Sequence, residues 1–177
     1  MKIMCLGGGP SGLYFAISMK LRDPAHQVTV IERNRANDTF GWGVVLSDEA
    51  LSRMQKNDPV STDAIRGNFS YWDDIAVVRG DQRTVSGGHG FAGIGRRLML
   101  SILQERAAAL GVDLRYETEF KSAEEYRQDY DLVVGCDGIN SAVRRDYAQA
   151  FQPDSVSATM ALQPRWCAVN SAPIAID

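Results

Sequence analysis

A glycine-rich turn near the N-terminus, GGGPSG at residues 7–12, separates two segments of different periodicity. The apolar run before it, residues 3–6, is typical of a short buried strand. The segment after it, residues 11–22, repeats apolar side chains at helical spacing, and a β-branched run follows at residues 28–31. The order of strand, glycine turn, helix and strand predicts a β-α-β unit with two parallel strands and a right-handed crossover.

The turn also satisfies the pattern GxGxxG, and Glu32 closes the second predicted strand 20 residues after Gly12. This is the spacing of a dinucleotide-binding fingerprint. We expect Gly7 to permit the tight turn, Gly9 to let the backbone approach a pyrophosphate, and Gly12 to let the helix lie close to the sheet. Pro10 lacks an N–H, which costs nothing in a first helical turn. The free N–H groups of that turn favour an anionic ligand.

The acid at position 32 indicates how a nucleoside would be held. Glu32 can accept hydrogen bonds from both hydroxyls of an adenosine ribose, and its charge repels a 2′-phosphate. The alternative interpretation is a glycine turn with a strand-terminal acid and no ligand. The pattern leaves open whether the dinucleotide is FAD or NAD.

A second group of chemically significant residues follows the apolar run at residues 132–135. Asp137 and Gly138 lie at the expected carboxyl end of a strand, where open α/β sheets bind ligands. Ser141 can cap the helix that comes next. The alternative is a simple Asx-type turn with a helix cap, in which the acid has only a structural role.

The remaining segments predict an α/β fold with an antiparallel insertion. A helix is predicted to begin after Ser47 and to end near Asp58-Pro59, and two strands at 69–78 and 83–86 are joined by a turn at Gly80-Asp81. A helix at 94–110 is ended by Gly111, and a strand follows at 112–118. The last predicted elements are a short helix with a Ser122/Glu125 capping box and a strand at 132–135. The two antiparallel strands interrupt the alternation of strands and helices.

Three motifs together resemble the N-terminal half of the class A flavin-dependent aromatic hydroxylases. They are GGGPSG with Glu32-Arg33, a helix that opens with Arg96-Arg97, and GCDGINSAVR at residues 135–144. The resemblance implies a Rossmann-like FAD-binding domain, with NAD(P)H as the co-substrate that reduces the flavin. It implies cofactor contacts from Gly7, Gly9, Pro10, Ser11, Gly12, Glu32, Arg33, Asp137 and Gly138, and from Arg97 near the flavin, with Arg96 as the alternative.

Two shorter segments narrow the resemblance. FGWGVVLSD at residues 40–48 and FAGIGR at residues 91–96 are similar to the salicylyl-CoA 5-hydroxylases and the aminobenzoyl-CoA monooxygenases. This similarity implies an aromatic substrate, in the form of an aryl-CoA thioester. The alternatives are a non-catalytic dinucleotide-binding domain and an NAD-dependent dehydrogenase, against which the Asp137-Gly138 motif argues.

The resemblance covers residues 1–154, which we expect to form the FAD-binding domain. Residues 155–177 contain only Arg165 and Asp177 as charged residues, show no sustained periodicity and do not resemble the family. We expect them to be a mobile, dispensable tail, of the kind that a frameshift or a truncation produces. Because the family's enzymes are much longer, we also expect this chain alone to be incomplete as a hydroxylase.

Composition excludes several other classes of protein. With 19 Lys and Arg against 22 Asp and Glu, the net charge is −3, so the chain lacks the basic surface that nucleic acids require. The three cysteines are too few and too far apart for a disulfide framework or a zinc site, so we expect no metal. No apolar run approaches a membrane span, and a cytoplasmic location is expected. The oligomeric state is left open.

Overall fold

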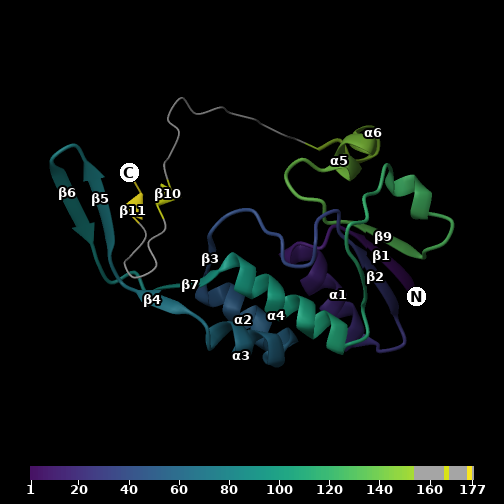
Figure 1. The fold of residues 1–177 in the computed structure, drawn as a ribbon, viewed down its shortest axis with the longest axis horizontal. Helices are drawn as coiled ribbons and strands as arrows, with labels where there is room; N and C mark the ends of the chain where they lie inside the picture. The colour runs from purple at the N-terminus through teal and green to yellow at the C-terminus, as the bar shows by residue number, and fades with distance from the viewer. Residues whose placement is uncertain (154–165, 168–174, 177) are drawn as a thin grey trace.

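A four-stranded parallel sheet forms one end of the computed structural model, which describes residues 1–153, 166–167 and 175–176 (Figure 1). Its strands are β1 (Lys2–Leu6), β2 (Gln27–Ile31), β8 (Asp113–Arg115) and β9 (Leu132–Gly135), in the order β8-β2-β1-β9. Helix α1 (Pro10–Arg22) connects β1 to β2, so the predicted parallel β-α-β unit is confirmed. The chain adds β2 and β8 on one side of β1 and β9 on the other, which makes the carboxyl end of β1 a topological switch point.

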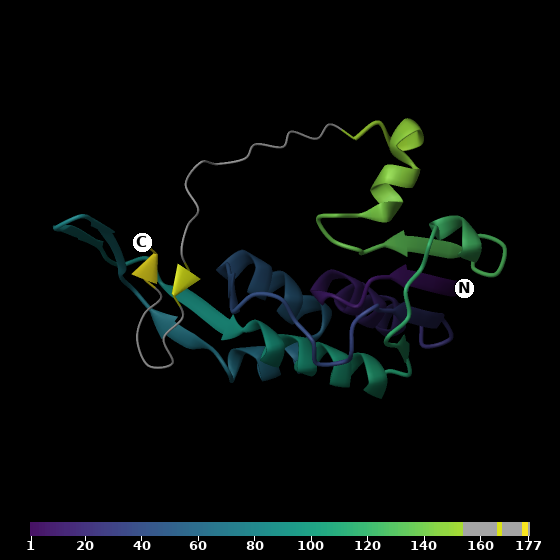
Figure 2. The ribbon, with the colours of Figure 1, turned by 45° about the horizontal axis from the view of Figure 1, so that its top comes forward.

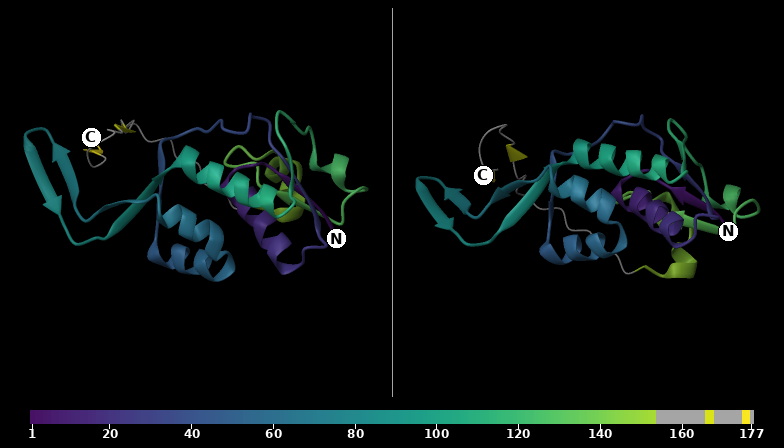
Figure 3. Two further views of the ribbon diagram at one scale, coloured as in Figure 1. Left: turned by 60° about the horizontal axis from the view of Figure 1, so that its bottom comes forward. Right: turned by 90° about the horizontal axis from the view of Figure 1, so that it is seen from below.

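Mainly antiparallel strands form the other end of the molecule, of which the sequence predicted only the pair joined by Gly80-Asp81. Strands β3 (Gly43–Leu46), β7 (Phe91–Gly95) and β4 (Ser70–Trp72) form a three-stranded sheet in the order β3-β7-β4. Strands β5 (Ile75–Arg79) and β6 (Gln82–Ser86) form a hairpin that projects from this sheet (Figure 3). Its turn is Gly80-Asp81, and Gly80 has a φ of 58°. The short strands β10 (Trp166–Cys167) and β11 (Ala175–Ile176) pair antiparallel with each other, and β11 pairs in parallel with β5.

Helices cover both faces of the parallel sheet (Figure 2). On one face, α1 packs beside the long helix α4 (Arg96–Ala109), and α4 packs in turn against α3 (Pro59–Arg66), which follows α2 (Asp48–Asn57). On the other face lie the 3₁₀ turn η1 (Ala123–Tyr126) and the short helices α5 (Ala142–Asp146) and α6 (Ala148–Phe151). None of the described helices is both long enough and apolar enough to cross a membrane.

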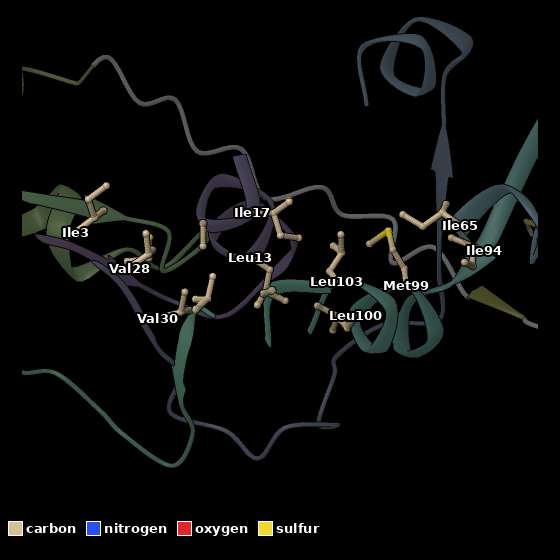
Figure 4. Packing of buried hydrophobic residues seen from close by; sticks show 14 residues of the cluster. Ile3, Leu13, Ile17, Val28, Val30, Ile65, Ile94, Met99, Leu100 and Leu103 are labelled. Atoms are coloured by element: carbon tan, nitrogen blue, oxygen red, sulfur yellow. The ribbon is translucent and has the colours of Figure 1, made fainter. Parts of the chain in front are cut away.

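One continuous core joins the two ends of the molecule (Figure 4). It runs from Ile3 and Val30 of the parallel sheet, through Leu13 of α1 and Leu103 of α4, to Ile94 of β7. Alternate residues of β1 face the opposite side, where Met4 and Leu6 form a second buried cluster with Ile31 and Ala123. Strand β1 is therefore buried on both faces, which explains why its sequence reads as a continuous apolar run and not as an alternating one.

The predicted helix at 94–110 is wrong at its first two residues. Ile94 and Gly95 complete strand β7, where they pair with Val44 and Gly43, and the helix begins at Arg96. The pairing partners lie about 50 residues earlier in the chain, and Gly95 is a poor helix former. The sheet therefore extends to the point where α4 begins, and it places Arg96 directly after a strand.

One further predicted boundary is confirmed, and two predicted strands differ from the structure. Helix α2 does end before Asp58-Pro59, but α3 starts at once, because Asp58 caps it and Pro59 occupies its first turn. The predicted strand at 69–78 divides into β4 and β5, which pair with different strands. Only residues 113–115 of the predicted strand at 112–118 pair in the sheet. The predicted tail at 155–177 lies outside the described residues except for β10 and β11.

Candidate functional site

The glycine turn lies at the carboxyl end of β1, and its glycines have different surroundings. Gly7 has a φ of 118°, and a Cβ on it would lie less than 3.0 Å from the carbonyl oxygen of Cys136. A Cβ on Gly12 would lie less than 3.0 Å from the carbonyl oxygen of Gly7. A Cβ on Gly9 would meet nothing within 4 Å. Gly7 and Gly12 therefore pack the turn against its neighbours, and Gly9 leaves open space on the outer side.

The N-terminus of α1, which is the positive end of the helix dipole, faces this open space. Pro10 is its first residue, and no acidic side chain lies in its first turn. The first helical hydrogen bond runs from Leu13 N–H to the carbonyl oxygen of Gly9, at 3.0 Å. The N–H groups of Ser11 and Gly12 precede that bond, so the helix itself does not use them. This arrangement suits an anionic group such as a pyrophosphate.

Glu32 follows β2 and turns its half-buried carboxylate toward the glycine turn. Its Oε2 accepts a hydrogen bond from Gly8 N–H at 2.9 Å. Its Oε1 accepts two from Asn34, from the backbone N–H at 2.9 Å and from Nδ2 at 2.7 Å. A Cβ on Gly8 would lie 2.8 Å from the Cβ of Glu32, a close approach that the sequence analysis did not identify. Arg33 is exposed.

A cavity of about 110 Å³ brings these groups together with the start of α4. The cavity is lined by Gly8, Gly9, Pro10, Glu32, Asn34, Arg35, Ala36, Asp38, Thr39, Phe40, Arg96, Leu100 and Gln104. Arg96 is half-buried, and its Nε donates to Thr39 Oγ1 at 3.1 Å. Arg97 is exposed and does not line this cavity. The structure thus brings Arg96, and not Arg97, to the glycine turn and Glu32.

A larger cavity, of about 600 Å³, lies at the opposite end of the parallel strands. Its lining includes Lys2 and Gln27, which begin β1 and β2, and Asp113, which begins β8. Ligands of open α/β sheets bind at the carboxyl ends of the strands, and none of the predicted cofactor residues lies in this cavity. We therefore place the candidate site at the smaller cavity.

The Asp137-Gly138 motif follows β9 beside the glycine turn, but its carboxylate caps a helix. Asp137 Oδ1 accepts from Ser141 Oγ at 2.6 Å, and Oδ2 accepts from the backbone N–H of Ala142 at 2.6 Å and of Val143 at 3.3 Å. Gly138 is exposed, with a φ of 80°. The Asp137 side chain therefore makes the contacts expected if this acid only caps a helix. Any contact from this motif to a ligand falls to its backbone or to the remaining lone pairs of the carboxylate.

The two cysteines near the glycine turn are poorly suited to nucleophilic chemistry. Burial, with a smaller effect of neighbouring Cys136, raises the pKa of the Cys5 thiol to about 12. Burial and the charge of Asp137 also raise the pKa of Cys136. Both thiols therefore stay protonated at neutral pH. Within the described residues, no group of three or more His, Cys, Asp or Glu side chains is placed to hold a metal ion.

Comparison with known proteins gives several relatives in sequence, although no family model matches the chain. The chain is 47% identical to salicyloyl-CoA 5-hydroxylase from Streptomyces sp. over 154 residues, which are 86% of this chain and 29% of the relative. It is 30% identical over 151 residues to a 3-hydroxy-4-methyl-anthranilyl-[aryl-carrier protein] 5-monooxygenase from Streptosporangium sibiricum, covering 85% of this chain and 42% of that protein. It is 32% identical over 144 residues to protodeoxyviolaceinate monooxygenase from Chromobacterium violaceum, covering 79% and 38%.

Solved structures share the fold at lower identity. A mutant of 2-methyl-3-hydroxypyridine-5-carboxylic acid oxygenase matches with a TM-score of 0.69 and 24% identity, over 81% of this chain and 41% of that one. A structure of CtdE in complex with FAD and a substrate matches with a TM-score of 0.53 and 19% identity, over 67% and 30%. The chain is therefore related to the flavin-dependent aromatic monooxygenases, and it spans between 29% and 42% of the length of the three curated relatives named above.

Proposed function

We propose that this chain forms the FAD-binding part of an aromatic monooxygenase that uses NAD(P)H and O2 and acts on an aryl-CoA thioester. The proposal of a bound FAD rests mainly on one observation: Gly9, the start of α1 and Glu32 line the same cavity. The aryl-CoA substrate rests on the 47% identity to salicyloyl-CoA 5-hydroxylase. Because the chain spans 29% of that relative, the reaction of the whole enzyme belongs to the proposal.

The residues present fit the adenosine diphosphate half of FAD. The open space at Gly9 lets a pyrophosphate approach the backbone, and the first turn of α1 offers N–H donors to it. Glu32 offers an anionic acceptor to ribose hydroxyls, and Arg96 adds a positive charge on the far wall of the cavity. When bound, FAD supplies the transfer of electrons from NAD(P)H and the activation of O2. The described residues bind and orient the cofactor, and they include no obvious acid-base pair for the reaction itself.

Two substitutions test the cofactor site. Replacing Glu32 with alanine removes a charge-assisted acceptor worth about 1.5–3 kcal/mol, so FAD should bind about 10- to 150-fold more weakly. Gly9→Val should also weaken binding, because its side chain enters the space through which the ligand reaches the backbone. Valine at position 9 meets no protein atom within 4 Å of its Cβ, so the fold should persist. Fluorescence titration with FAD measures both effects, and unchanged affinity in both variants would contradict the assignment.

The reaction is tested with the whole enzyme of which this chain would form the FAD-binding part, because we expect the chain alone to be incomplete as a hydroxylase. We expect salicyloyl-CoA to stimulate NADH oxidation in the presence of FAD and to be hydroxylated, with free salicylate as the matched control that lacks the thioester. Stimulation by salicylate alone would refute the thioester as the substrate form. Flavin binding without any response to either compound would favour the non-catalytic alternative. Reversible hydride transfer from NADH without flavin would favour the dehydrogenase.

A further inference from the structure

The hydrogen bonds of Glu32 leave it fewer free acceptor positions than a ribose requires. An ionised carboxylate has about four lone-pair positions that accept hydrogen bonds. Asn34 occupies two of them on Oε1, and Gly8 N–H occupies one on Oε2. About one position therefore remains, on Oε2. An adenosine ribose presents two hydroxyls, so Glu32 can hold one of them and leaves the other for a second acceptor.

Asn34 carries an acceptor in the same cavity. Its side-chain NH2 group points to Glu32 because an ionised carboxylate accepts and does not donate. The orientation of that amide leaves its carbonyl oxygen, Oδ1, for a different partner. Asn34 lines the cavity together with Gly9 and Glu32, and within the described part of the chain no donor contacts Asn34 Oδ1.

The backbone of both residues is fixed from the neighbouring segment. Thr118 N–H donates to the carbonyl oxygen of Glu32 at 2.9 Å, and Glu117 N–H donates to that of Asn34 at 3.2 Å. Glu117 has a φ of 50°, a left-handed conformation that is unfavourable for a residue with a side chain. The segment after β8 thus contains a residue in an unfavourable backbone conformation, and the same segment fixes the backbone of Glu32 and Asn34 through hydrogen bonds. Such strain is typical of positions that a functional site requires.

From these contacts we propose that Asn34 is a specificity-determining residue for the ribose of the bound nucleotide. Its Nδ2 orients Glu32, and its Oδ1 accepts one of the two ribose hydroxyls, while Oε2 of Glu32 accepts the other. The inference rests on the proposed function, because it assumes that an adenosine nucleotide occupies this cavity. It assigns the two hydroxyls to two residues, and this division can be tested one hydroxyl at a time.

The test is calorimetric titration of the chain with ADP, 2′-deoxy-ADP and 3′-deoxy-ADP. We expect the wild-type chain to bind ADP about three- to tenfold more tightly than the analogue that lacks the hydroxyl held by Asn34, which is the effect of one neutral hydrogen bond. The preference over the other analogue should be larger, because the charged Glu32 holds the missing hydroxyl. In Asn34→Ala, the backbone N–H of residue 34 and Gly8 N–H still hold the Glu32 carboxylate. This variant should therefore lose the preference for ADP over one analogue and keep its preference over the other.

Asn37→Ala is the matched control, because Asn37 lies in the same loop but is exposed, contacts Ser101 at the surface and does not line the cavity. It should keep both preferences. Equal weakening of ADP and both analogues in Asn34→Ala would indicate a purely structural role and overturn the inference. Unchanged preferences, or the loss of both together, would also overturn the second-acceptor role. Absence of ADP binding by the wild-type chain would refute the cofactor site itself, which separates the two failures.

Discussion

Replacing Gly12 with alanine is expected to destabilise the chain by about 3 kcal/mol, although alanine is the better helix former. Helix propensity alone favours alanine by about 1 kcal/mol. However, a Cβ at position 12 would lie less than 3.0 Å from the carbonyl oxygen of Gly7, and 3.2 Å from the Cβ of Cys136. Because the first contact is with backbone, no side-chain rotation relieves it, and the start of α1 must move away from the turn. Urea unfolding measures the loss of stability.

Gly67→Ala is the matched control for this prediction. Gly67 caps the end of α3 with a φ of −63°, and a Cβ there would lie 3.4 Å from the nearest neighbour, the carbonyl oxygen of Asp63. Its free energy of unfolding should change by less than about 0.5 kcal/mol. If Gly12→Ala proved as stable as the wild-type chain, the close packing of α1 on the glycine turn would be wrong. The same displacement should also weaken ADP binding, since it moves the N–H groups of the first turn.

The glycine turn could be predicted from the sequence because its signal is local. Strand, turn and helix follow one another within 22 residues, and the role of Gly12 depends on a backbone approach to Gly7 inside that segment. The approach of Gly7 to the backbone of Cys136 is not local, and the sequence did not show it. The end of the predicted helix at 94–110 was recognisable from a local signal, since a glycine follows it. The start of that helix could not be predicted, because Ile94 and Gly95 pair with strand β3. Helical periodicity in the sequence gives no information on such a pairing.

The side-chain contacts of the site were not predictable from the sequence. The spacing that identified Glu32 gives no information on how many of its acceptor positions Asn34 occupies. The sequence left two interpretations of Asp137 open, and only the geometry shows its carboxylate capping α5. Likewise, the sequence alone does not show which of the adjacent arginines, Arg96 or Arg97, faces the site. They differ because β7 ends at Gly95 and fixes the rotation at which α4 begins.

A buried ion pair between Asp58 and Arg106 is expected to have the second large effect on stability. The Asp58 side chain is 0% exposed, and that of Arg106 is 19% exposed, with Nη2 at 2.8 Å from Oδ1. This pair ties the start of α3 to the last turn of α4, whose other end forms the wall of the candidate site. Arg106→Leu leaves a carboxylate buried without its partner, so we expect a loss of about 3–5 kcal/mol at pH 7, measured by urea unfolding.

The pH dependence of that loss distinguishes the charge of the pair from its packing. Burial alone raises the pKa of Asp58, but the hydrogen bonds and charge of Arg106, with the hydrogen bond from Ser61, lower it below its usual value. The wild-type chain therefore gains stability from this group above about pH 4 and loses it as the pH falls further. In Arg106→Leu only the hydrogen bonds from Ser61 still oppose burial, which is the largest effect on this group, so the pKa of Asp58 rises and the variant loses stability as the pH increases above about 4. The difference in free energy of unfolding between the two proteins should become smaller as the pH is lowered from about 7 toward 3.

The double variant with Asp58→Asn keeps an N-cap side chain without a charge, so it should be more stable at pH 7 than Arg106→Leu. A difference between the wild-type chain and Arg106→Leu that does not change with pH would show that packing of the arginine, and not its charge, stabilises this corner of the fold.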